Sequence, residues 1–455
     1  MIHRLIFRKS SFLMLTVLLF MQCQQKPSTL ITDQELATQW ADLTLHITQH
    51  TPANSPTFAS RCLGYIGLTM YESIVHGYPS YQSMVGQLND LDELPLPEED
   101  QTYNWQLALN AGQAEILRSI YIQTADSNKV MIDVLEQSIV ENITSRITDE
   151  ATIKRSVAYG KSIAQAIFEW SKTDGGHRGY LKNFDKELVH PTFLGSWKPP
   201  LYAQSFSHHP LHPYWGKNRT FVQENQALPN PEIIPYDTAK TSPYYQQFLA
   251  VYEKDKTLTQ AEKEAALWWG DDPTDTFTPP GHSYYIATIA IKAKQPPLIK
   301  CAETYARIGI AVADAFIKCW KWKYDFFSER PNTFIPQFID IEWESFWPDP
   351  PFPAFPSGHA IQAATAATVM IDLYGNEFSF VDSAHVGRER DELREVDFVA
   401  REFDTFWEVA EETAKSRFYG GIHTPQDNEV GLVEGKKIGN NVNELRWENN
   451  AMSSR

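Results

Sequence analysis

The chain has 455 residues, 42% of them hydrophobic and 13% aromatic, so it can bury a sizeable core in one large body or in roughly two or three average domains. Its formal charge is −17 and its sequence pI is about 5.2. This acidic balance argues against nucleic acid and anionic membrane surfaces as partners, because both attract net positive patches. A site for an anion would therefore have to be a local concentration of Arg and Lys.

Residues 1–23 are typical of an export signal, with a basic start and an apolar run over residues 12–21 that is too short to span a bilayer. Cys23 follows directly, as in bacterial lipoproteins, although the residues before it are not the usual small ones. We therefore expect an exported protein, in the periplasm or at the cell surface, and leave open whether Cys23 carries a lipid anchor. No later stretch is long and apolar enough to cross a membrane. The remaining cysteines are three and form no CxxC pair, which predicts buried, inert thiols at Cys62, Cys301 and Cys319.

Apolar residues recur at helical spacing through the first third of the chain, beginning with a typical helix start at Thr32 and Glu35. Alternating strand patterns of any length are absent, so we expect an all-α fold of helical bundles. Large helical faces also make a homodimer plausible. The helices predicted in this N-terminal region (residues 30–175) are 32–50, 60–76, 103–124, 127–144 and 150–173.

Composition changes between residues 176 and 243, where Pro, Gly, His and aromatic residues are frequent and no period is visible. A segment of this length is usually either a functional covering loop or disordered, and its aromatic content favours an ordered wrap over the core. Helical patterns resume in a C-terminal region, residues 244–447, where Pro331 and Pro336 are expected to force the chain out of helix. The helices predicted there are 244–252, 259–269, a further helix after His282, 298–323, 360–373, 398–416 and 427–443.

Residues 356–359, Pro-Ser-Gly-His, precede an Ala-rich helix. Free backbone N–H groups and the positive end of the helix dipole would meet at Ser357 and Gly358, and Gly allows an anion to approach closely. His359, in the first turn, could act as a general acid or base. Taken alone, this tetrapeptide could equally be an ordinary helix start with a solvent-facing histidine.

Further donors for an oxyanion lie on either side of this helix start. Lys323 and Arg330 stand seven residues apart, and Arg417 and His423 come later. Arg offers a fork that matches oxyanion geometry and Lys a point charge. Asp427, four residues after His423, could fix the imidazole tautomer, although another carboxylate or a backbone carbonyl could do so instead.

These three stretches, in this order, resemble the signature of the superfamily that contains type 2 phosphatidic acid phosphatases and vanadium-dependent haloperoxidases. The signature consists of Lys and Arg-Pro separated by six residues, then Pro-Ser-Gly-His, then Ser-Arg followed after five residues by His and after three more by Asp. Every position is present, and the match covers roughly residues 260–440. The N-terminal helices and the Pro/aromatic-rich segment are also similar, more loosely, to the bacterial haloperoxidase branch.

The resemblance implies a role for each matched residue. In a haloperoxidase, His423 would bind the vanadium of a vanadate cofactor, and His359 would be the acid–base residue that activates hydrogen peroxide. In a phosphatase of the same superfamily, His423 would instead attack phosphorus and His359 would protonate the leaving group. The residues that would neutralise the oxyanion are Lys323, Arg330, Ser357, the Gly358 amide and Arg417.

Three neighbouring residues favour the haloperoxidase interpretation by resemblance. Trp320 and Phe352 occupy positions that flank the halide region, and aromatic residues there are similar to the chloroperoxidase and bacterial iodoperoxidase patterns. Asp272 would orient Arg417. Plain core packing is the alternative for the two aromatic residues.

We therefore expect a vanadium-dependent haloperoxidase that oxidises halide with hydrogen peroxide to hypohalous acid, with iodide or bromide favoured because they are easier to oxidise than chloride. Diffusing hypohalite could halogenate organic acceptors. The alternatives are a soluble acid phosphatase working through a phosphohistidine at His423, and an oxyanion-binding surface protein without turnover.

Overall fold

The computed structural model describes residues 30–147, 149–200, 207 and 209–449. The chain divides into two units, residues 1–30 and 31–455, and the site residues predicted above all lie in the second. The predicted export signal and Cys23 lie outside the described residues. None of the helices that the structure describes is both long and apolar enough to span a bilayer.

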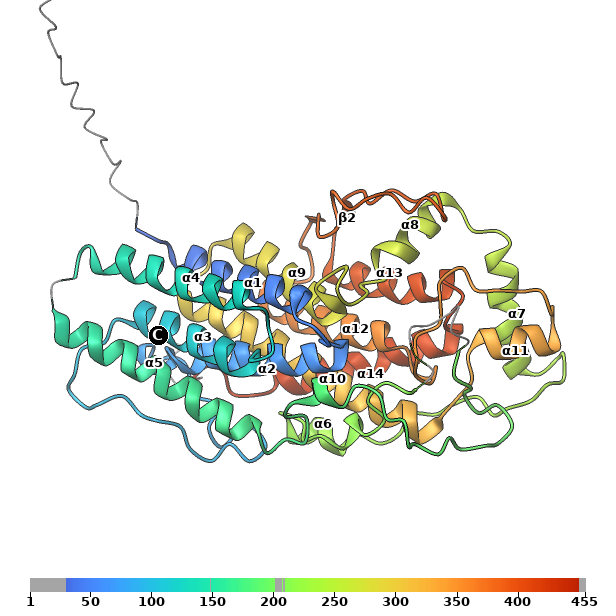
Figure 1. Cartoon of the computed structure of the whole chain (residues 1–455), viewed down its shortest axis with the longest axis horizontal. Helices are drawn as coiled ribbons and strands as arrows, with labels where there is room; N and C mark the ends of the chain where they lie inside the picture. Colours follow the sequence, from blue (N-terminus) through green and yellow to red (C-terminus); the bar gives the residue numbers. More distant parts are fainter. Residues whose placement is uncertain (1–29, 148, 201–206, 208, 450–455) are drawn as a thin grey trace, which may run out of the picture. The chain divides into compact units, whose positions relative to one another are not determined.

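The second unit is built from helices, as predicted (Figure 1). The short 3₁₀ helices are η1 (Val75–Gly77), η2 (Gly179–Leu181) and η3 (Trp215–Lys217). The described residues also contain an antiparallel strand pair, β1 (Phe380–Asp382) and β2 (Arg401–Phe403). The α-helices are α1 (Asp33–His50), α2 (Pro56–Glu72), α3 (Trp105–Ile120), α4 (Asp126–Thr144), α5 (Glu150–Ser171), α6 (Gln223–Ala227), α7 (Pro243–Asp255), α8 (Gln260–Trp268), α9 (Thr278–Lys294), α10 (Leu298–Phe326), α11 (Pro331–Phe338), α12 (Gly358–Tyr374), α13 (Phe406–Tyr419) and α14 (Pro425–Asn443).

Two predictions about the C-terminal region, residues 244–447, were wrong. Pro331 and Pro336 do not end the helical structure but lie inside α11. Pro331 stands at the first position of α11, where its missing N–H has no helical partner to lose, and Pro336 costs the helix a single backbone hydrogen bond. The helix predicted over 398–416 begins only at Phe406, where Thr405 and Glu408 form a capping box, and β2 precedes it.

Helix α10 is the centre of the fold. It is buried along almost its whole length, from Leu298 to Lys323, and packs against α2 and α12. A helix that is apolar nearly all round can only be stable when other helices surround it. Cys301 and Cys319 on α10, like Cys62 on α2, are buried free thiols, which confirms that prediction.

Helices α12 and α14 lie backbone to backbone because α14 presents glycine every fourth residue. A Cβ added to Gly435 would come within 2.3 Å of the carbonyl oxygen of Ile361 on α12. A Cβ on Gly431 would lie 3.0 Å from the carbonyl oxygen of Ser357, and Gly439 is similarly crowded. This contact holds the first turn of α12 directly beside the first turns of α14.

Residues 176–243 contact the C-terminal region through backbone hydrogen bonds, as expected for a covering segment. The amide of Trp197 donates to the carbonyl of Phe327 at 2.8 Å. The amide of Leu211 donates to the carbonyl of Pro351, also at 2.8 Å. The change of composition at residues 176 and 243 thus marks a change of secondary structure within one compact unit.

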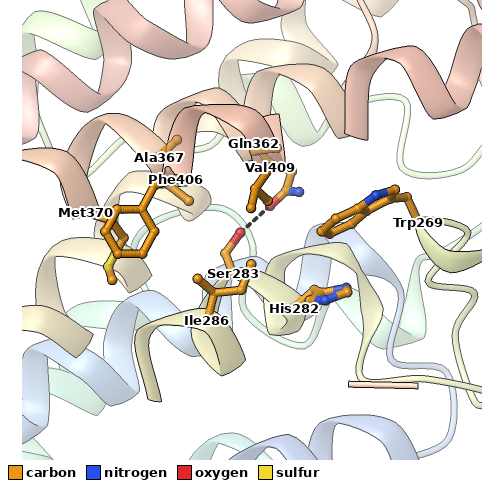
Figure 2. A pocket seen from close by; sticks show the side chains of 11 residues that line it. Trp269, His282, Ser283, Ile286, Gln362, Ala367, Met370, Phe406 and Val409 are labelled. Carbon is orange, nitrogen blue, oxygen red and sulfur yellow. Dashed lines mark hydrogen bonds between the residues drawn. The ribbon is translucent and has the colours of Figure 1, made fainter. Parts of the chain in front are cut away.

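Polar links also cross the interior between helices. Figure 2 shows the hydroxyl of Ser283 on α9 donating to the side-chain oxygen of Gln362 on α12, at 2.8 Å. This hydrogen bond runs beside a small cavity of about 20 Å³ that Trp269 and His282 also line. A space of this size holds at most a water molecule and is no substrate site.

Replacing Gly435 with Ala tests the backbone contact between α12 and α14. We expect the free energy of unfolding to fall by about 2 kcal/mol or more, because the new methyl group meets a backbone carbonyl that cannot rotate away. Urea denaturation measures the change. Val433→Ala, at a position of α14 that is 56% exposed, should change stability by less than about 0.5 kcal/mol. Equal effects of the two substitutions would contradict the contact.

The buried carboxyl group of Glu72 should make the stability of the protein depend on pH. Burial raises the pKa of this carboxyl group to about 7, although it accepts hydrogen bonds from the Met84 amide and the Ser83 hydroxyl. Because the folded-state pKa lies above the ordinary value of 4.5, the stability that the neutral form contributes is complete below pH 4.5 and is lost as the pH rises through 7. In Glu72→Gln this loss is absent.

We therefore expect the difference in free energy of unfolding between Glu72→Gln and the parent to shift in favour of the variant between pH 5 and pH 8, by up to about 3 kcal/mol. Denaturation of both proteins at the two pH values checks it. A difference that stays constant with pH would show that the carboxyl group titrates normally.

Candidate active site

The first turn of α12 forms one side of the site. Ser357 is the N-cap residue, and its own amide donates to the carbonyl of Asp427 on α14 at 2.9 Å. Gly358 lies against α10, since an added Cβ would be 3.6 Å from the Trp320 ring and 3.9 Å from the side chain of Lys323. The free amide groups of this helix start therefore lie beside Lys323, as the sequence predicts.

Lys323, in the last turn of α10, has its ammonium group turned toward the segment before α12. Its three N–H donors bond to the carbonyls of Pro353 at 2.9 Å and of Ala354 and Pro356 at 2.6 Å each. Complete burial, with a smaller contribution from Arg330, lowers the pKa of Lys323 to about 7. The carbonyl groups stabilise the charged form, and an anion nearby would do so further.

Arg330 is held at the N-terminus of α11. Its guanidinium donates to the carbonyls of Phe352 at 3.0 Å, Ile422 at 2.8 Å and Pro353 at 3.4 Å. These bonds use three of the five N–H groups of an arginine and leave two. The bond to Ile422 fixes the guanidinium beside the residue that precedes His423.

Arg417, near the end of α13, donates to the Ser416 hydroxyl at 3.1 Å and to the carbonyl of Ala266. Three N–H groups remain. Burial lowers the pKa of Arg417 to about 10, and the nearby carboxylate of Asp272 opposes this shift. The side chain stays cationic at neutral pH.

His423 lies just before α14 and is bound by Asp427 in the first turn of that helix. Its Nδ1 donates to the Asp427 carboxylate at 3.0 Å, and the same oxygen accepts the amide of Thr424 at 3.0 Å. Burial, and then the neighbouring cations Arg330 and Lys323, hold the pKa of His423 well below its usual range. The imidazole is therefore neutral, with its proton on Nδ1 and a free lone pair on Nε2.

His359 is half-buried in the first turn of α12. Its Nε2 donates to the carbonyl of Gly270 at 3.3 Å, and since a carbonyl can only accept, Nε2 carries the proton and Nδ1 does not. Burial and then Arg417 lower the pKa of His359 to about 3. A neutral imidazole with a free Nδ1 is suited to accept a proton.

A pocket of about 690 Å³ opens over these groups. Gly358, His359, Arg417 and His423 line it, whereas Lys323, Arg330 and Ser357 are completely buried and are not part of its wall. The rest of the wall is largely apolar, which strengthens charge interactions inside. Its other members include Leu211, Phe316, Trp320, Trp347, Pro350, Pro351 and Phe352, together with the carboxylates of Asp271, Asp272 and Asp349.

Comparison with known proteins agrees with this geometry. Residues 337–448 match the family model described as the second helical-bundle domain of VCPO. The chain is 21% identical over 458 residues to the vanadium chloroperoxidase of Curvularia inaequalis, covering 82% of this chain and 74% of that protein. A crystal structure described as the first bacterial vanadium-dependent iodoperoxidase superimposes with a TM-score of 0.78 and 28% identity, covering 92% of this chain and 97% of the other.

The chain thus resembles vanadium-dependent haloperoxidases in its fold and over part of its sequence. A bacterial vanadium-dependent chloroperoxidase in its holo form shares the fold, with a TM-score of 0.62 at 14% identity over 91% of this chain and 92% of the other. The all-α fold predicted from the sequence is thereby confirmed.

Trp320 and Phe352, expected to flank a halide region, pack against one another in the pocket wall. Their ring centroids are 4.9 Å apart. The indole N–H of Trp320 donates to the carbonyl of Leu211 at 3.1 Å, so it offers no hydrogen bond to a halide in this arrangement. The Phe352 ring lies 5.2 Å from the cationic groups of both Lys323 and Arg330.

Asp272, expected to orient Arg417, stands in the pocket wall without a direct ion pair to it among the described residues. The two side chains still interact through their charges. Burial raises the pKa of Asp272 to about 6, and Arg417 opposes that shift. The pairing of Asp272 with Arg417 therefore remains a prediction.

Sequence reasoning missed two sets of residues at this site. Asp349 lines the pocket, and burial raises the pKa of its carboxyl group to about 6 while Arg330 opposes the shift. Asp271, next to Asp272, is buried and bound to His282, 11 residues later, and to His385, 114 residues later. Asp271 stands in a Trp-Gly-Asp-Asp stretch, residues 269–272, but no sequence pattern connects it to these partners.

Asp427→Asn tests how His423 is held. The variant keeps an oxygen that accepts the Nδ1 proton but loses the negative charge, so Nε2 becomes a weaker electron donor and the site more positive. For a ligand coordinated by Nε2, we expect the loss of donor strength to outweigh the gain in positive charge, so that its binding weakens by about 10- to 100-fold. Phosphate, which is held by charge and hydrogen bonds alone, should bind the variant at least as tightly as it binds the parent. Isothermal titration calorimetry with orthovanadate and with phosphate measures both.

Glu434→Gln is the matched control, since Glu434 is a buried acid of the same helix that does not line the pocket. It should leave both affinities unchanged. An Asp427→Asn protein that binds both anions like the parent would show that Asp427 only caps α14.

Proposed function

We propose that the chain is a haloperoxidase that binds orthovanadate at His423 and uses hydrogen peroxide to oxidise halide, with iodide or bromide preferred, to hypohalous acid. The observation that carries this proposal is the state of His423. It is a neutral imidazole with Nδ1–H held by Asp427, and it lines the pocket together with Arg417, while the buried cations Arg330 and Lys323 act on it through their charge. Similarity to the bacterial iodoperoxidase structure supports it.

The residues present suit orthovanadate. A metal centre needs a lone pair, which Nε2 of His423 supplies, and its oxygen atoms need hydrogen-bond donors and positive charge. The three remaining N–H groups of Arg417 and the Gly358 amide would supply donors from the pocket wall, and the two free N–H groups of Arg330 and the Ser357 hydroxyl lie buried behind it. Lys323 adds a charge close behind, because its own protons are already bonded to backbone carbonyls.

When bound, vanadate supplies a Lewis-acidic centre that makes peroxide open to attack by halide without a change in the oxidation state of the metal. The side chains around it provide the rest. Arg417 and the Gly358 amide line the pocket and hold negative charge there, while Arg330 and Lys323 stabilise that charge from behind. Because the surrounding wall is largely apolar, these interactions are much stronger than they would be in water.

His359 is the group that moves a proton. Its Nδ1 is unprotonated at neutral pH, since its pKa is lowered to about 3, and Nε2 is anchored on the carbonyl of Gly270. The negative charge of a bound oxyanion would raise this pKa, and Nδ1 could then take a proton from hydrogen peroxide as peroxide enters and return it to the departing oxygen. A site that only bound an oxyanion would have no need of such a base.

Iodide and bromide are preferred in this proposal because they give up electrons more readily than chloride. The indole N–H of Trp320 cannot donate a hydrogen bond to a halide in the pocket, because it is bound to the carbonyl of Leu211. The carboxylates of Asp272 and Asp349 in the wall would repel an anion whenever they are ionised. In a site that binds halide weakly, the halide that is oxidised most easily should react fastest.

The test is a halide-by-halide peroxidase assay on protein reconstituted with orthovanadate. We expect turnover with iodide and bromide, little with chloride, inhibition by phosphate, and a loss of more than about 100-fold in His423→Ala. Thermal unfolding of the parent should also shift upward with orthovanadate, because a ligand that binds only the folded state stabilises it.

Other outcomes would redirect the assignment. Hydrolysis of a phosphate ester without vanadium, lost in His423→Ala, would indicate a phosphatase that uses His423 as nucleophile. Binding of phosphate and vanadate with neither activity would indicate an oxyanion-binding protein. Either result overturns the proposal.

A further inference from the structure

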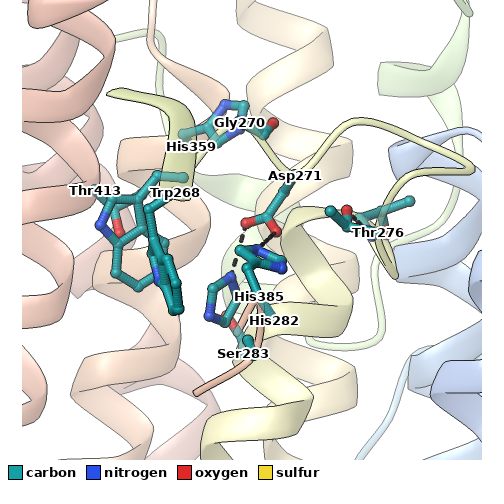
Figure 3. Close-up of polar contacts among 12 residues, drawn as sticks. Trp268, Gly270, Asp271, Thr276, His282, Ser283, His359, His385 and Thr413 are labelled. Atoms are coloured by element: carbon teal, nitrogen blue, oxygen red, sulfur yellow. Dashed lines mark hydrogen bonds and ion pairs between the residues drawn. The ribbon is translucent and has the colours of Figure 1, made fainter. Parts of the chain in front are cut away.

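A buried chain of carboxylates and imidazoles begins at Asp271 in the pocket wall. Figure 3 shows Asp271 between the two imidazoles of His282 and His385. The carboxylate of Asp271 accepts hydrogen bonds from Nδ1 of His282 and from Nε2 of His385, both at 2.9 Å. The other nitrogen of His282 bonds to Asp382 at 2.8 Å, and Asp382 also accepts the indole N–H of Trp268 at 2.8 Å. We call these five residues the Asp271 network.

His282 is a cation in this network. Both of its ring nitrogens face carboxylates, so both must donate, and an imidazole with two N–H groups is protonated. The two carboxylates raise the pKa of His282 to about 10 against the effect of burial. All five residues are at most 2% exposed, so an uncompensated charge here would be strongly unfavourable.

The network joins segments that are far apart in the sequence. Trp268 ends α8, His282 belongs to α9, and Asp382 and His385 come from β1 and the turn that follows it. The two histidines bond to Asp271, in the loop between α8 and α9, whereas Trp268 joins the network through Asp382. Asp271 has φ +49°, a left-handed conformation that a residue with a side chain adopts only when its surroundings impose it.

The neighbours of Asp271 are groups of the active site. The carbonyl of Gly270, one residue before, accepts the Nε2 proton of His359 at 3.3 Å (Figure 3). The carboxylate of Asp272, one residue after, stands in the pocket wall and interacts electrostatically with Arg417. A shift of Asp271 would therefore move both groups.

Asp271, His282 and His385 could also be read as ligands of a metal ion, since their ligand atoms lie within 4.8 Å of one another. The hydrogen bonds favour a different function. Every nitrogen named above has an acceptor, and a protonated His282 has no lone pair to offer a metal. The arrangement is complete as a hydrogen-bonded anchor.

We propose that His282 and His385 are positioning residues which, by anchoring Asp271, fix the Gly270 carbonyl against His359 and so select the tautomer of the acid–base histidine. This role extends the haloperoxidase function proposed above. The network holds Asp271 in its left-handed backbone conformation and thereby keeps Nδ1 of His359 free for a proton. His385 is the partner that can be changed without removing the buried cation.

The test compares His385→Phe, which keeps a flat ring but removes the donor, with His385→Gln, whose amide N–H can still reach Asp271. Full-length, vanadate-free protein labelled with ¹⁵N at histidine reports the tautomer of each ring. We expect His359 to show only the Nε2–H form in the parent and in His385→Gln, and averaged ring-nitrogen shifts in His385→Phe. After reconstitution with orthovanadate, kcat for iodide should fall about tenfold in His385→Phe and recover most of that loss in His385→Gln.

Asp174→Asn is the control for a merely structural effect. It breaks the buried Arg61–Asp174 ion pair, whose residues do not line the pocket, and should lower the Tm without changing the His359 signals. If His385→Phe does not fold, Trp268→Phe removes one donor to Asp382 and should shift the His359 signals in the same direction by less.

Three results would overturn the inference. One is an unchanged His359 tautomer in folded His385→Phe, and another is an equal change in Asp174→Asn. The third is one equivalent of a divalent metal in the purified parent that is lost in His385→Gln. Because the ring signals are read without vanadate, they decide the role of the network even if the protein oxidises no halide.

Discussion

The close approach of α12 and α14 is the constraint on which the site depends. Gly431, Gly435 and Gly439 remove the side chains that would separate the two helices, so backbone meets backbone. As a result the N-termini of both helices lie together, one with the Ser357-Gly358 amides and the other with His423 and Asp427. Helix starts are sites of positive potential, and two of them combine here before any charged side chain is counted.

The second constraint is buried positive charge in an acidic protein. Lys323, Arg330 and Arg417 are removed from water, and backbone carbonyls rather than carboxylates are their direct partners. Carbonyl dipoles stabilise a cation without neutralising it, so the region stays electropositive at short range while the protein as a whole repels anions. An anion that enters finds its donors already fixed in direction, and little of the binding free energy is lost in reorganising them.

The sequence predicted the all-α fold and grouped most residues of the candidate site, because their order and spacing form a specific signature. Helix ends were less predictable, as at Phe406, where a capping box after a short strand set the start instead of the apolar period that begins earlier. The bonding of Lys323 to three carbonyls could not be predicted, since it depends on how residues 353–356 turn back over α10. His282 and His385 were missed for a similar reason: their carboxylate partners Asp382 and Asp271 are 100 and 114 residues away in the chain.

Leu211, from the segment that covers the C-terminal region, carries a consequence for the order of folding. Its carbonyl accepts the side-chain donors of Trp320 and Tyr324, 109 and 113 residues further along, and its amide bonds to Pro351. Contacts across such long loops form only after the entropy of closing them has been overcome, whereas helix pairs close in sequence can assemble first. The aromatic wall of the pocket should thus form later than the pairing of helices close in sequence, such as α3 with α4 and α5, and, like the packing of α10 against α2, it requires segments more than 100 residues apart to meet.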